Sequence, residues 1–488
     1  MKWFQASLYV GVCVVGLIMF SGCAKKKVDD GKIPVTTSSE EARKQFLEGR
    51  ELADKLLQTN SIEHFDKAIS LDPNFASAHL ARANVAGTAK EFFEHLKHAV
   101  DHADKASEGE RLLILANEAG TSGKSAKQQE YLETLVAKYP KDERAHFALG
   151  GFLFGQQDYN GAIEHYKKAM EIAPGFSPVY NIMGYAYRQV GNYSEAEKAF
   201  KKYTELIPND PNPHDSYAEL MMKMGRYDES IEHYRKALSI DPTFVASYNG
   251  IATNYMYKGM PDSASAELKK LMDVARNDGE RRTAMATQTV VYVDAGKMNE
   301  ALQEQDKQYA MAEKINDLAQ MSGDLATKGN ILVEMGKFDD AKTAFEKSIE
   351  LSDKSDMSQD VKDNAHLFHH FNMATVAIGK KDMAQAKAEA EQFRKGSEAS
   401  KNQNQIRQSH TLMGMIALAE KNYDGAIAEL NQTTLQNPQN LYRMGWAYQS
   451  KGDKAKAKEF YMKAAQFNGL PALNSAFIRA KAAKMGAM

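Results

Sequence analysis

The feature that most constrains this chain is a pattern of bulky, small and proline residues that returns every 34 residues. In its clearest stretch the pattern holds His146, Leu149, Gly150, Leu153, Ala162, Tyr166, Ala169 and Pro174. One period later the same slots hold Tyr180, Met183, Gly184, Tyr187, Ala196, Phe200, Tyr203 and Pro208, and another period later His214, Tyr217, Ala218, Met221, Ser230, Tyr234, Ala237 and Pro242. A fixed period of this length predicts stacked units, because no single unit buries its apolar face alone.

The spacing inside one period predicts two helices packed as an antiparallel pair. Bulky residues three or four apart, such as Leu149 and Leu153, form an apolar stripe on the first helix. A proline follows the second helix, where its missing N–H and fixed φ stop the helix. Small residues such as Gly150 mark a close approach of the two backbones. The first helices end at Gly155, Gly191 and Gly225, where a glycine favours a left-handed cap.

These slots resemble the tetratricopeptide repeat (TPR), whose signature is W-x2-L-G-x2-Y, then A-x3-F, then P. No unit of the three above keeps Trp in the first slot. The resemblance implies an all-α, TPR-type α-solenoid of about twelve helix-pair units. We expect these units to start near Ala42, Ala76, Gly109, Glu143, Ser177, Pro211, Val245, Arg282, Ser322, Leu367, Arg407 and Pro438.

The spacing of these starts divides the chain into blocks. It is regular through residues 42–276 and irregular through residues 277–469, where the longer units indicate extended second helices, for example from Asn299 to about Asn316, and a polar insert at Ser352–Asp363. Residues 470–488 are expected to hold a capping helix that covers the open end of the stack, as terminal repeats require.

The amino terminus predicts an export signal. Lys2 precedes an apolar run from Leu8 to Phe20, which is too short for a bilayer core that needs about 20 residues. The run ends in Ser21-Gly22-Cys23, which resembles a bacterial lipobox and implies removal of residues 1–22 and acylation of Cys23. An ordinary signal peptide or an uncleaved anchor is the alternative. Two or more acyl chains give stable membrane anchoring.

A flexible tether is expected at residues 23–41, because this polar stretch contains Gly31 and Pro34. The lipobox resemblance implies a lipid-anchored protein of the cell envelope. Lys25 stands where an Asp would favour the inner membrane in some bacteria, so the outer membrane facing the periplasm is favoured.

Composition and motifs argue against catalysis. The formal charge of −2 gives no basic face for nucleic acid. The chain contains no H-E-x-x-H, G-x-S-x-G, Walker or C-x-x-C motif, so we expect no enzyme and no cofactor. Two histidine clusters have helical spacing, and we interpret them as packing or surface residues. Whether they bind metal stays open and no metal is assigned; they are His95, His98 and His102, and His366, His369 and His370.

The resemblance also implies a concave groove lined by the first helices, in which a protein partner or peptide segment lies. Asparagine suits the groove because its amide both donates and accepts hydrogen bonds to a peptide backbone. Aromatic residues and arginine are enriched in binding hot spots. The candidate groove residues are Asn117, Phe147, Phe154, Asn181, Tyr185, Arg188, Glu219 and Asn249.

The predicted function is a membrane-anchored scaffold that binds a partner protein, with the main site between Glu143 and Ala275. The alternative is a solenoid that captures a small molecule, glycan or peptidoglycan fragment, since Phe147, Phe154 and Tyr185 could stack on sugars. A long continuous groove would favour a polypeptide, and a closed aromatic pocket would favour a small ligand.

Overall fold

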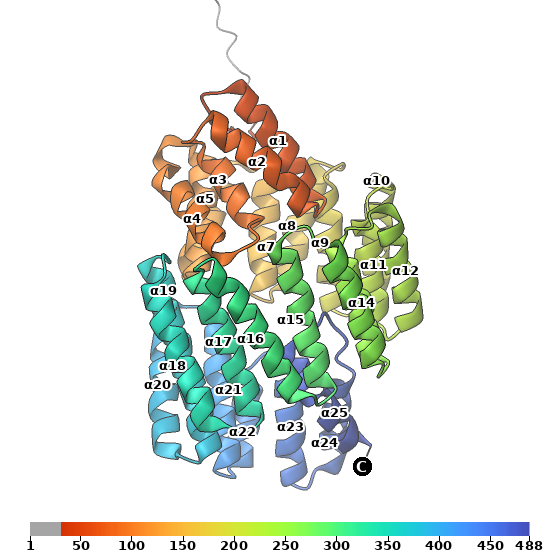
Figure 1. Ribbon diagram of the computed structural model, residues 1–488, viewed down its shortest axis with the longest axis vertical. Helices are drawn as coiled ribbons and strands as arrows, with labels where there is room; N and C mark the ends of the chain where they lie inside the picture. The colour runs from red at the N-terminus through yellow and green to blue at the C-terminus, as the bar shows by residue number, and fades with distance from the viewer. Residues whose placement is uncertain (1–30, 488) are drawn as a thin grey trace, which may run out of the picture.

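A computed structural model describes residues 31–487, and within that range the chain is helical with no strand (Figure 1). The regular first half contains α1 (Glu40–Asp54), α2 (Gln58–Leu71), α3 (Ala76–Asn84), α4 (Ala89–Asp101), the 3₁₀ helix η1 (Ala103–Lys105), α5 (Glu108–Thr121), α6 (Ser125–Lys138), α7 (Glu143–Gly155), α8 (Tyr159–Ile172), α9 (Ser177–Gln189), α10 (Tyr193–Leu206), α11 (Asn212–Lys223), α12 (Tyr227–Ile240), α13 (Val245–Tyr257) and α14 (Pro261–Val274).

The second half begins with seven longer helices of 17 to 22 residues and ends with four of 8 to 14 residues. They are α15 (Asp278–Asp294), α16 (Met298–Lys314), α17 (Leu318–Glu334), α18 (Phe338–Lys354), α19 (Gln359–Lys380), α20 (Met383–Ser400), α21 (Gln403–Ala419), α22 (Tyr423–Leu430), α23 (Pro438–Ser450), α24 (Lys454–Ala465) and α25 (Leu473–Gly486). In the described range α1 to α24 form twelve consecutive pairs and α25 follows them, which confirms the predicted solenoid and its final helix. Units after Val274 begin earlier than expected because α15, α17, α19 and α21 extend at their N-termini.

In several units the small slot accommodates an aromatic ring. A Cβ added at Gly150 would lie 2.5 Å from the Tyr166 ring, and one at Gly184 would lie 2.6 Å from Phe200. The glycines therefore make room for a side chain of the second helix, whereas we expected them to mark a close approach of two backbones.

The first slot, which lacks Trp in the units discussed, forms a polar link between units. His79 Nε2 lies 3.1 Å from the carbonyl oxygen of Pro73, and Tyr180 OH donates to the carbonyl of Pro174 at 3.0 Å. His146 and Tyr248 reach the prolines at the same offset, Pro140 and Pro242. The ring fills the slot while its polar tip satisfies the carbonyl just before the unit.

Two of the three predicted left-handed caps are correct. Gly191 and Gly225 both have φ of 76° at the end of their first helix. In the α7/α8 unit, however, Gln157 takes the positive φ of 66°, and Gly155 remains in α7. Gly155 is exposed, and an added Cβ there would meet nothing within 4 Å.

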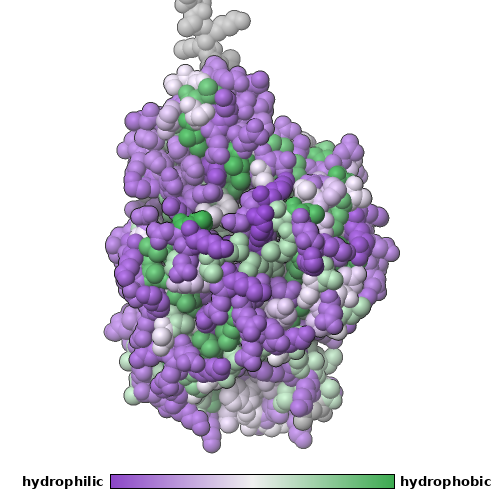
Figure 2. Space-filling model, in the orientation of Figure 1, coloured by the Kyte–Doolittle hydropathy of each residue, from purple (hydrophilic) through white to green (hydrophobic). Residues whose placement is uncertain are grey.

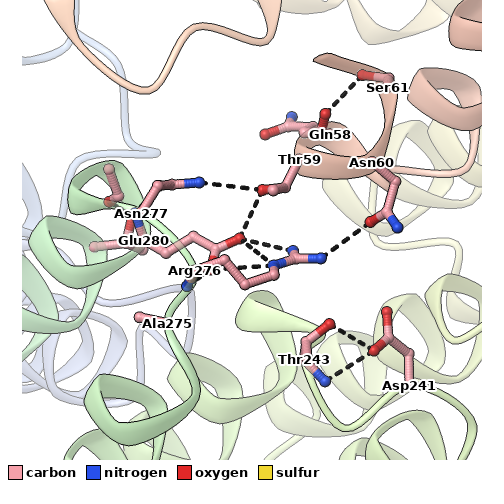
Figure 3. Close-up of polar contacts among 12 residues, drawn as sticks. Gln58, Thr59, Asn60, Ser61, Asp241, Thr243, Ala275, Arg276, Asn277 and Glu280 are labelled. Atoms are coloured by element: carbon pink, nitrogen blue, oxygen red, sulfur yellow. Dashed lines mark hydrogen bonds and ion pairs between the residues drawn. The ribbon is translucent and has the colours of Figure 1, made fainter. Parts of the chain in front are cut away.

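Helices with odd numbers form the inner layer of a superhelix, since α7 packs beside α9, α9 beside α11, and α11 beside α13. The superhelix makes two stacked turns (Figure 1). Where the second turn starts, the Thr59 hydroxyl donates to Glu280 Oε1 at 2.6 Å across 221 residues of sequence, and Arg276 donates to Asn60 Oδ1 at 3.0 Å (Figure 3). An added Cβ at Gly279 would lie 2.6 Å from the carbonyl oxygen of Gly87, so the two backbones nearly touch.

Further contacts between the two superhelical turns share one arrangement. The loop region that joins the two helices of a pair in the first superhelical turn lies against the N-terminal end of a helix in the second. Asp317, the N-cap of α17, accepts a bond from the Lys90 amide at 3.0 Å. Asn402 donates to the Gly123 carbonyl at 3.1 Å, and Asn404 donates to the Gly155 carbonyl at 3.0 Å. Asp317 thus satisfies a backbone N–H near the start of α4, and the two asparagines donate to carbonyls at or near helix ends.

Residues 31–39 are held against the body, which corrects the predicted flexible tether for that part of residues 23–41. The backbone amides of Ile33, Thr36 and Ser38 donate to the carboxylates of Asp142, Glu110 and Asp72 at 2.8, 3.0 and 2.9 Å. This extended strap therefore crosses the starts of three units, and Glu40 and Glu41 already belong to α1.

The predicted leader and Cys23 lie outside the described residues. Among the helices of residues 31–487, none has the length and apolarity that crossing a membrane requires.

Candidate binding channel

The inner layer of first helices carries the predicted groove residues, and we call the inner face of this layer the channel. Three of them form one cluster. Tyr185 OH donates to Glu219 Oε1 at 2.9 Å, and Arg188 Nη1 donates to Glu219 Oε2 at 3.2 Å. The Arg188 guanidinium also lies 4.6 Å from the centre of the Tyr185 ring. The cluster joins α9 to α11, and the side chains of Arg188 and Glu219 are only 13% and 9% exposed.

Burial shapes the acid–base properties of this part of the channel. Burial first, and then the Glu219 carboxylate, raise the pKa of Asp215 to about 8, although the Ser247 hydroxyl bonds to it at 2.7 Å. Burial likewise raises the pKa of Tyr185 well above its usual value. The raised pKa favours the neutral form of the Asp215 carboxyl.

Two of the predicted asparagines have unsatisfied hydrogen-bonding atoms. Asn181 and Asn249 are 7% and 8% exposed, and the side-chain oxygen of each lacks a hydrogen-bond partner. Arg188 Nε is buried without a partner as well. A buried polar group without a partner costs about 1–3 kcal/mol. A ligand that supplied complementary donors and acceptors would recover part of that free energy.

The two predicted phenylalanines pack inside their own unit or against its neighbour. Phe147 contacts the rings of Tyr166 and Phe176, with ring centres 6.0 and 5.3 Å apart. Phe154 meets Tyr159 edge-on at 5.3 Å. Both remain half-buried, and the structure does not bring them together with Tyr185 into one aromatic pocket.

Asn117 lines a cavity of about 410 Å³ where α5, α6 and α7 face the start of α21. The wall consists of Leu113, Ala116, Asn117, Gln128, Leu132, Ala148, Gly151, Phe152, Gly155, Gln156 and Asn404, without a charged side chain. An added Cβ at Gly151 or Gly155 would meet nothing within 4 Å, so the two glycines open the cavity to the channel. Asn117 also donates to Asn84 at 3.4 Å, and Asn84 is exposed.

The sequence did not predict that the chain covers part of its own groove. The irregular segment 466–472 crosses the ends of α11 and α13, where Tyr227 OH donates to Asn468 Oδ1 at 2.9 Å and Tyr257 OH donates to the Gly469 carbonyl at 2.8 Å. The only local signal is the helix-breaking sequence Asn468-Gly469-Leu470-Pro471, which says nothing of where the segment lies. The open stretch of the inner face therefore runs upstream of α11.

The first histidine cluster gathers around a fourth histidine. His79 Nδ1 lies 3.1 Å from His95 Nδ1, and the rings of His79 and His98 stack at 5.0 Å. In the second cluster His366 and His370 form hydrogen bonds with Asp353 and Glu389 at 2.8 and 2.7 Å. Across residues 31–487, no three His, Cys, Asp or Glu side chains are grouped to hold a metal ion.

Comparisons with known proteins point to one family. Tetratricopeptide-repeat profiles match residues 115–175, 153–220, 325–355 and 438–469, and a TPR repeat profile matches residues 218–259. Anaphase-promoting complex subunit 3 of Dictyostelium discoideum is 39% identical over 57 residues, which are 12% of this chain and 6% of that protein. The chain thus spans only a small part of the curated relative that it matches.

Two solved structures resemble parts of the chain. A tetratricopeptide repeat protein from Parabacteroides merdae is 16% identical, with a TM-score of 0.35, and covers 55% of this chain and 92% of its own. A MamA protein is 23% identical, with a TM-score of 0.28, and covers 34% and 91%. No inference about this chain follows from likeness at that level.

The helix pairs, their 34-residue period and their inner layer define a helical-repeat solenoid of the kind that binds proteins. The repeat profiles then place it within that class: the chain is a tetratricopeptide repeat protein.

Proposed function

We propose that this TPR protein is a lipid-anchored scaffold of the bacterial cell envelope. In this proposal it holds a neutral segment of a partner protein along the open inner face of α5, α7 and α9. The proposal rests on two observations: the buried atoms Asn181 Oδ1 and Arg188 Nε of α9 have no partner, and an uncharged cavity lies between α5, α6 and α7, where Gln156 Oε1 also lacks a partner. A peptide backbone offers the donors and acceptors that these atoms lack.

A polypeptide suits this face better than a sugar does. Phe147, Phe154 and Tyr185 are each engaged with neighbouring rings, so they do not form the shared aromatic pocket that a glycan would require. The exterior also offers little: Figure 2 shows a face that is mostly hydrophilic, with its hydrophobic residues in separate groups. A large continuous apolar patch would have marked a docking site there.

The membrane and envelope parts of the proposal rest on Cys23 and the leader that precedes it. The strap of residues 31–39 is consistent with an anchor, because it ties the chain just after Cys23 to three units.

Photo-crosslinking in intact cells tests the proposal. A crosslinking amino acid at Gly151 should capture one protein repeatedly, and the same residue at Lys167, exposed on α8 of the same unit, should not. Gly151→Leu places an apolar side chain at the opening of the cavity, where its Cβ meets nothing within 4 Å, and should abolish capture by a crosslinker placed at Asn117, whereas Lys167→Leu should not. Equal capture from Gly151 and Lys167 would contradict an inner-face site.

A further inference from the structure

Helix α25 is enclosed on all sides at its start. Ser475, Ala476, Phe477 and Ile478 are all buried, and four consecutive residues point in every direction around a helix at 100° intervals. A cap lying on the end of a stack buries one stripe only. In its second half α25 returns to that ordinary pattern, because Ala482 and Gly486 are buried while Lys481 and Lys484 are exposed.

The surroundings of α25 come from both superhelical turns. It packs against α15, α23 and α24. Its apolar cluster includes Met222 of α11 and Met256 of α13 from the first turn, together with Val293 and Ile331 from the second. The helix therefore fills the channel in the way that a bound helix would, where we expected it only to cover the end of the stack.

One arginine and one tyrosine fasten this helix. Arg479 Nε donates to Asp294 Oδ1 at 2.6 Å, a second nitrogen donates to the Met256 carbonyl at 3.3 Å, and the guanidinium lies 5.6 Å from the centre of the Tyr257 ring. The Asp294 side chain is 5% exposed. Tyr257 OH also accepts a bond from the Gly469 amide at 3.1 Å, so it holds the segment that leads into α25.

The segment between α24 and α25 allows α25 to leave the channel without unwinding α24. Residues 466–472 form no helix, Leu470 is 51% exposed, and the bonds of Asn468 and Gly469 to the first turn go to tyrosine hydroxyls. Segments held by few side-chain bonds belong to the low-stability part of a fold, which opens locally.

We propose that the channel face of α11, α13, α15 and α23 is a docking surface for an α-helix, and that α25 is its internal occupant. The partner helix would carry the chemistry of Ala476-Phe477-Ile478-Arg479: a small residue, two large apolar residues and an arginine for Asp294. This surface lies downstream of the open face assigned to the partner segment. It deepens the proposed scaffold function by adding a helix-binding site that the chain itself blocks.

The experiment uses the full chain and a fluorescent peptide of residues 471–488 added in trans. Arg479→Ala in the chain loosens α25, while the peptide keeps its arginine. The peptide should then bind the variant about tenfold more tightly than the parent, because the binding-competent fraction rises. Lys481→Ala is the matched control: Lys481 is 52% exposed and pairs with Glu334, and the peptide should bind this variant with the same affinity as the parent. Hydrogen exchange should be faster in α25 than in α13, and Arg479→Ala should accelerate only α25.

Peptide affinity that Arg479→Ala leaves unchanged, or equal exchange in α25 and α13, would overturn the proposal. If Arg479→Ala fails to fold by circular dichroism, Tyr257→Phe takes its place, because it removes the bonds to Gly469 and keeps the ring. Gly151→Leu, which tests the scaffold function, should leave peptide binding unchanged. Failure of one proposal is thereby distinguished from failure of the other.

Discussion

Two adjacent glycines on α7 show how one residue type serves two purposes. Gly150 receives the Tyr166 ring at a distance that leaves no room for a Cβ, whereas Gly151 faces open space. The sequence pattern distinguishes them, since Gly150 falls in the small slot of the repeat and Gly151 falls in an inner-face slot.

Gly150→Ala should destabilise the protein by about 1–3 kcal/mol through overpacking against Tyr166. Gly151→Ala should be neutral or stabilising by up to about 1 kcal/mol, because alanine is the better helix former. Urea denaturation of the two variants and the parent measures the difference. Equal losses at both positions would mean that the small slot does not limit packing.

Histidine in the first slot gives the fold a pH dependence. Burial first, and then the nearby His95, His98 and His102, lower the pKa of His79 to about 4, although its bond to the Pro73 carbonyl opposes this. In the unfolded chain His79 has its usual pKa of about 6.5. Between pH 6.5 and 4 the unfolded state therefore binds more protons, and the free energy of unfolding falls as the pH is lowered.

His79→Tyr should flatten this dependence, because Tyr180 and Tyr248 reach the equivalent proline carbonyl in their own units, and a phenol has an ordinary pKa of about 10. The measurement is the difference in unfolding free energy between pH 7.5 and pH 5. It should be smaller in the variant than in the parent, with His233, whose pKa burial and neighbouring charges lower to about 4, supplying part of the remainder. An unchanged difference would assign the pH dependence to other groups.

At the scale of helices, the period predicted nearly everything that is local. The starts of α3, α7, α9 and α13 fall where the slots placed them, because small, bulky and proline positions act within one unit. The starts of α19 and α21 were placed late, since extra helical turns at their N-termini leave the slots unchanged.

Contacts between distant units leave no signal in the sequence pattern. Nothing in the 34-residue pattern says that Gly87 meets Gly279, or that Asn404 donates to a carbonyl 249 residues away. The candidate site shows the same division: the slots placed Asn181, Tyr185 and Arg188 on the inner face, but not which stretch of that face α25 would fill.

Gly279→Ala tests the contact between the turns. The new Cβ would meet the carbonyl oxygen and Cα of Gly87, which are backbone atoms that no side-chain rotation can move away. We expect hydrogen exchange to rise around Thr59, Gly87 and the start of α15, while the far side of the first turn keeps its protection. Gly323→Ala on α17, where an added Cβ meets nothing within 4 Å, is the control. Unchanged exchange in Gly279→Ala would show that the turns do not rest on each other there.

The whole molecule departs from a simple stack in which each unit touches only its neighbours. Thr59, Asn402 and Arg479 each join units far apart in sequence, and the cluster around α25 spans both turns. Damage in one unit should therefore reach the unit above or below it as well as the next one along the chain. These contacts hold the two superhelical turns together, so the two proposed docking regions belong to one rigidly connected inner face.

In the proposed scaffold, Cys23 sets the position of the molecule in the cell. The strap begins at Gly31, eight residues after the cysteine, and a chain of that length spans at most about 28 Å at about 3.5 Å per residue. An acylated Cys23 would therefore hold the solenoid close to the bilayer, with the starts of α3, α5 and α7 nearest the anchor.

Cys23→Ala should abolish labelling by a radioactive fatty acid and leave the protein in the soluble fraction or unprocessed in the inner membrane. Cys13→Ala should leave both unchanged, because that residue lies in the predicted leader. Fatty-acid labelling that persists in Cys23→Ala would refute the lipid anchor, while the inner-face site and the helix-binding surface would stand on their own measurements.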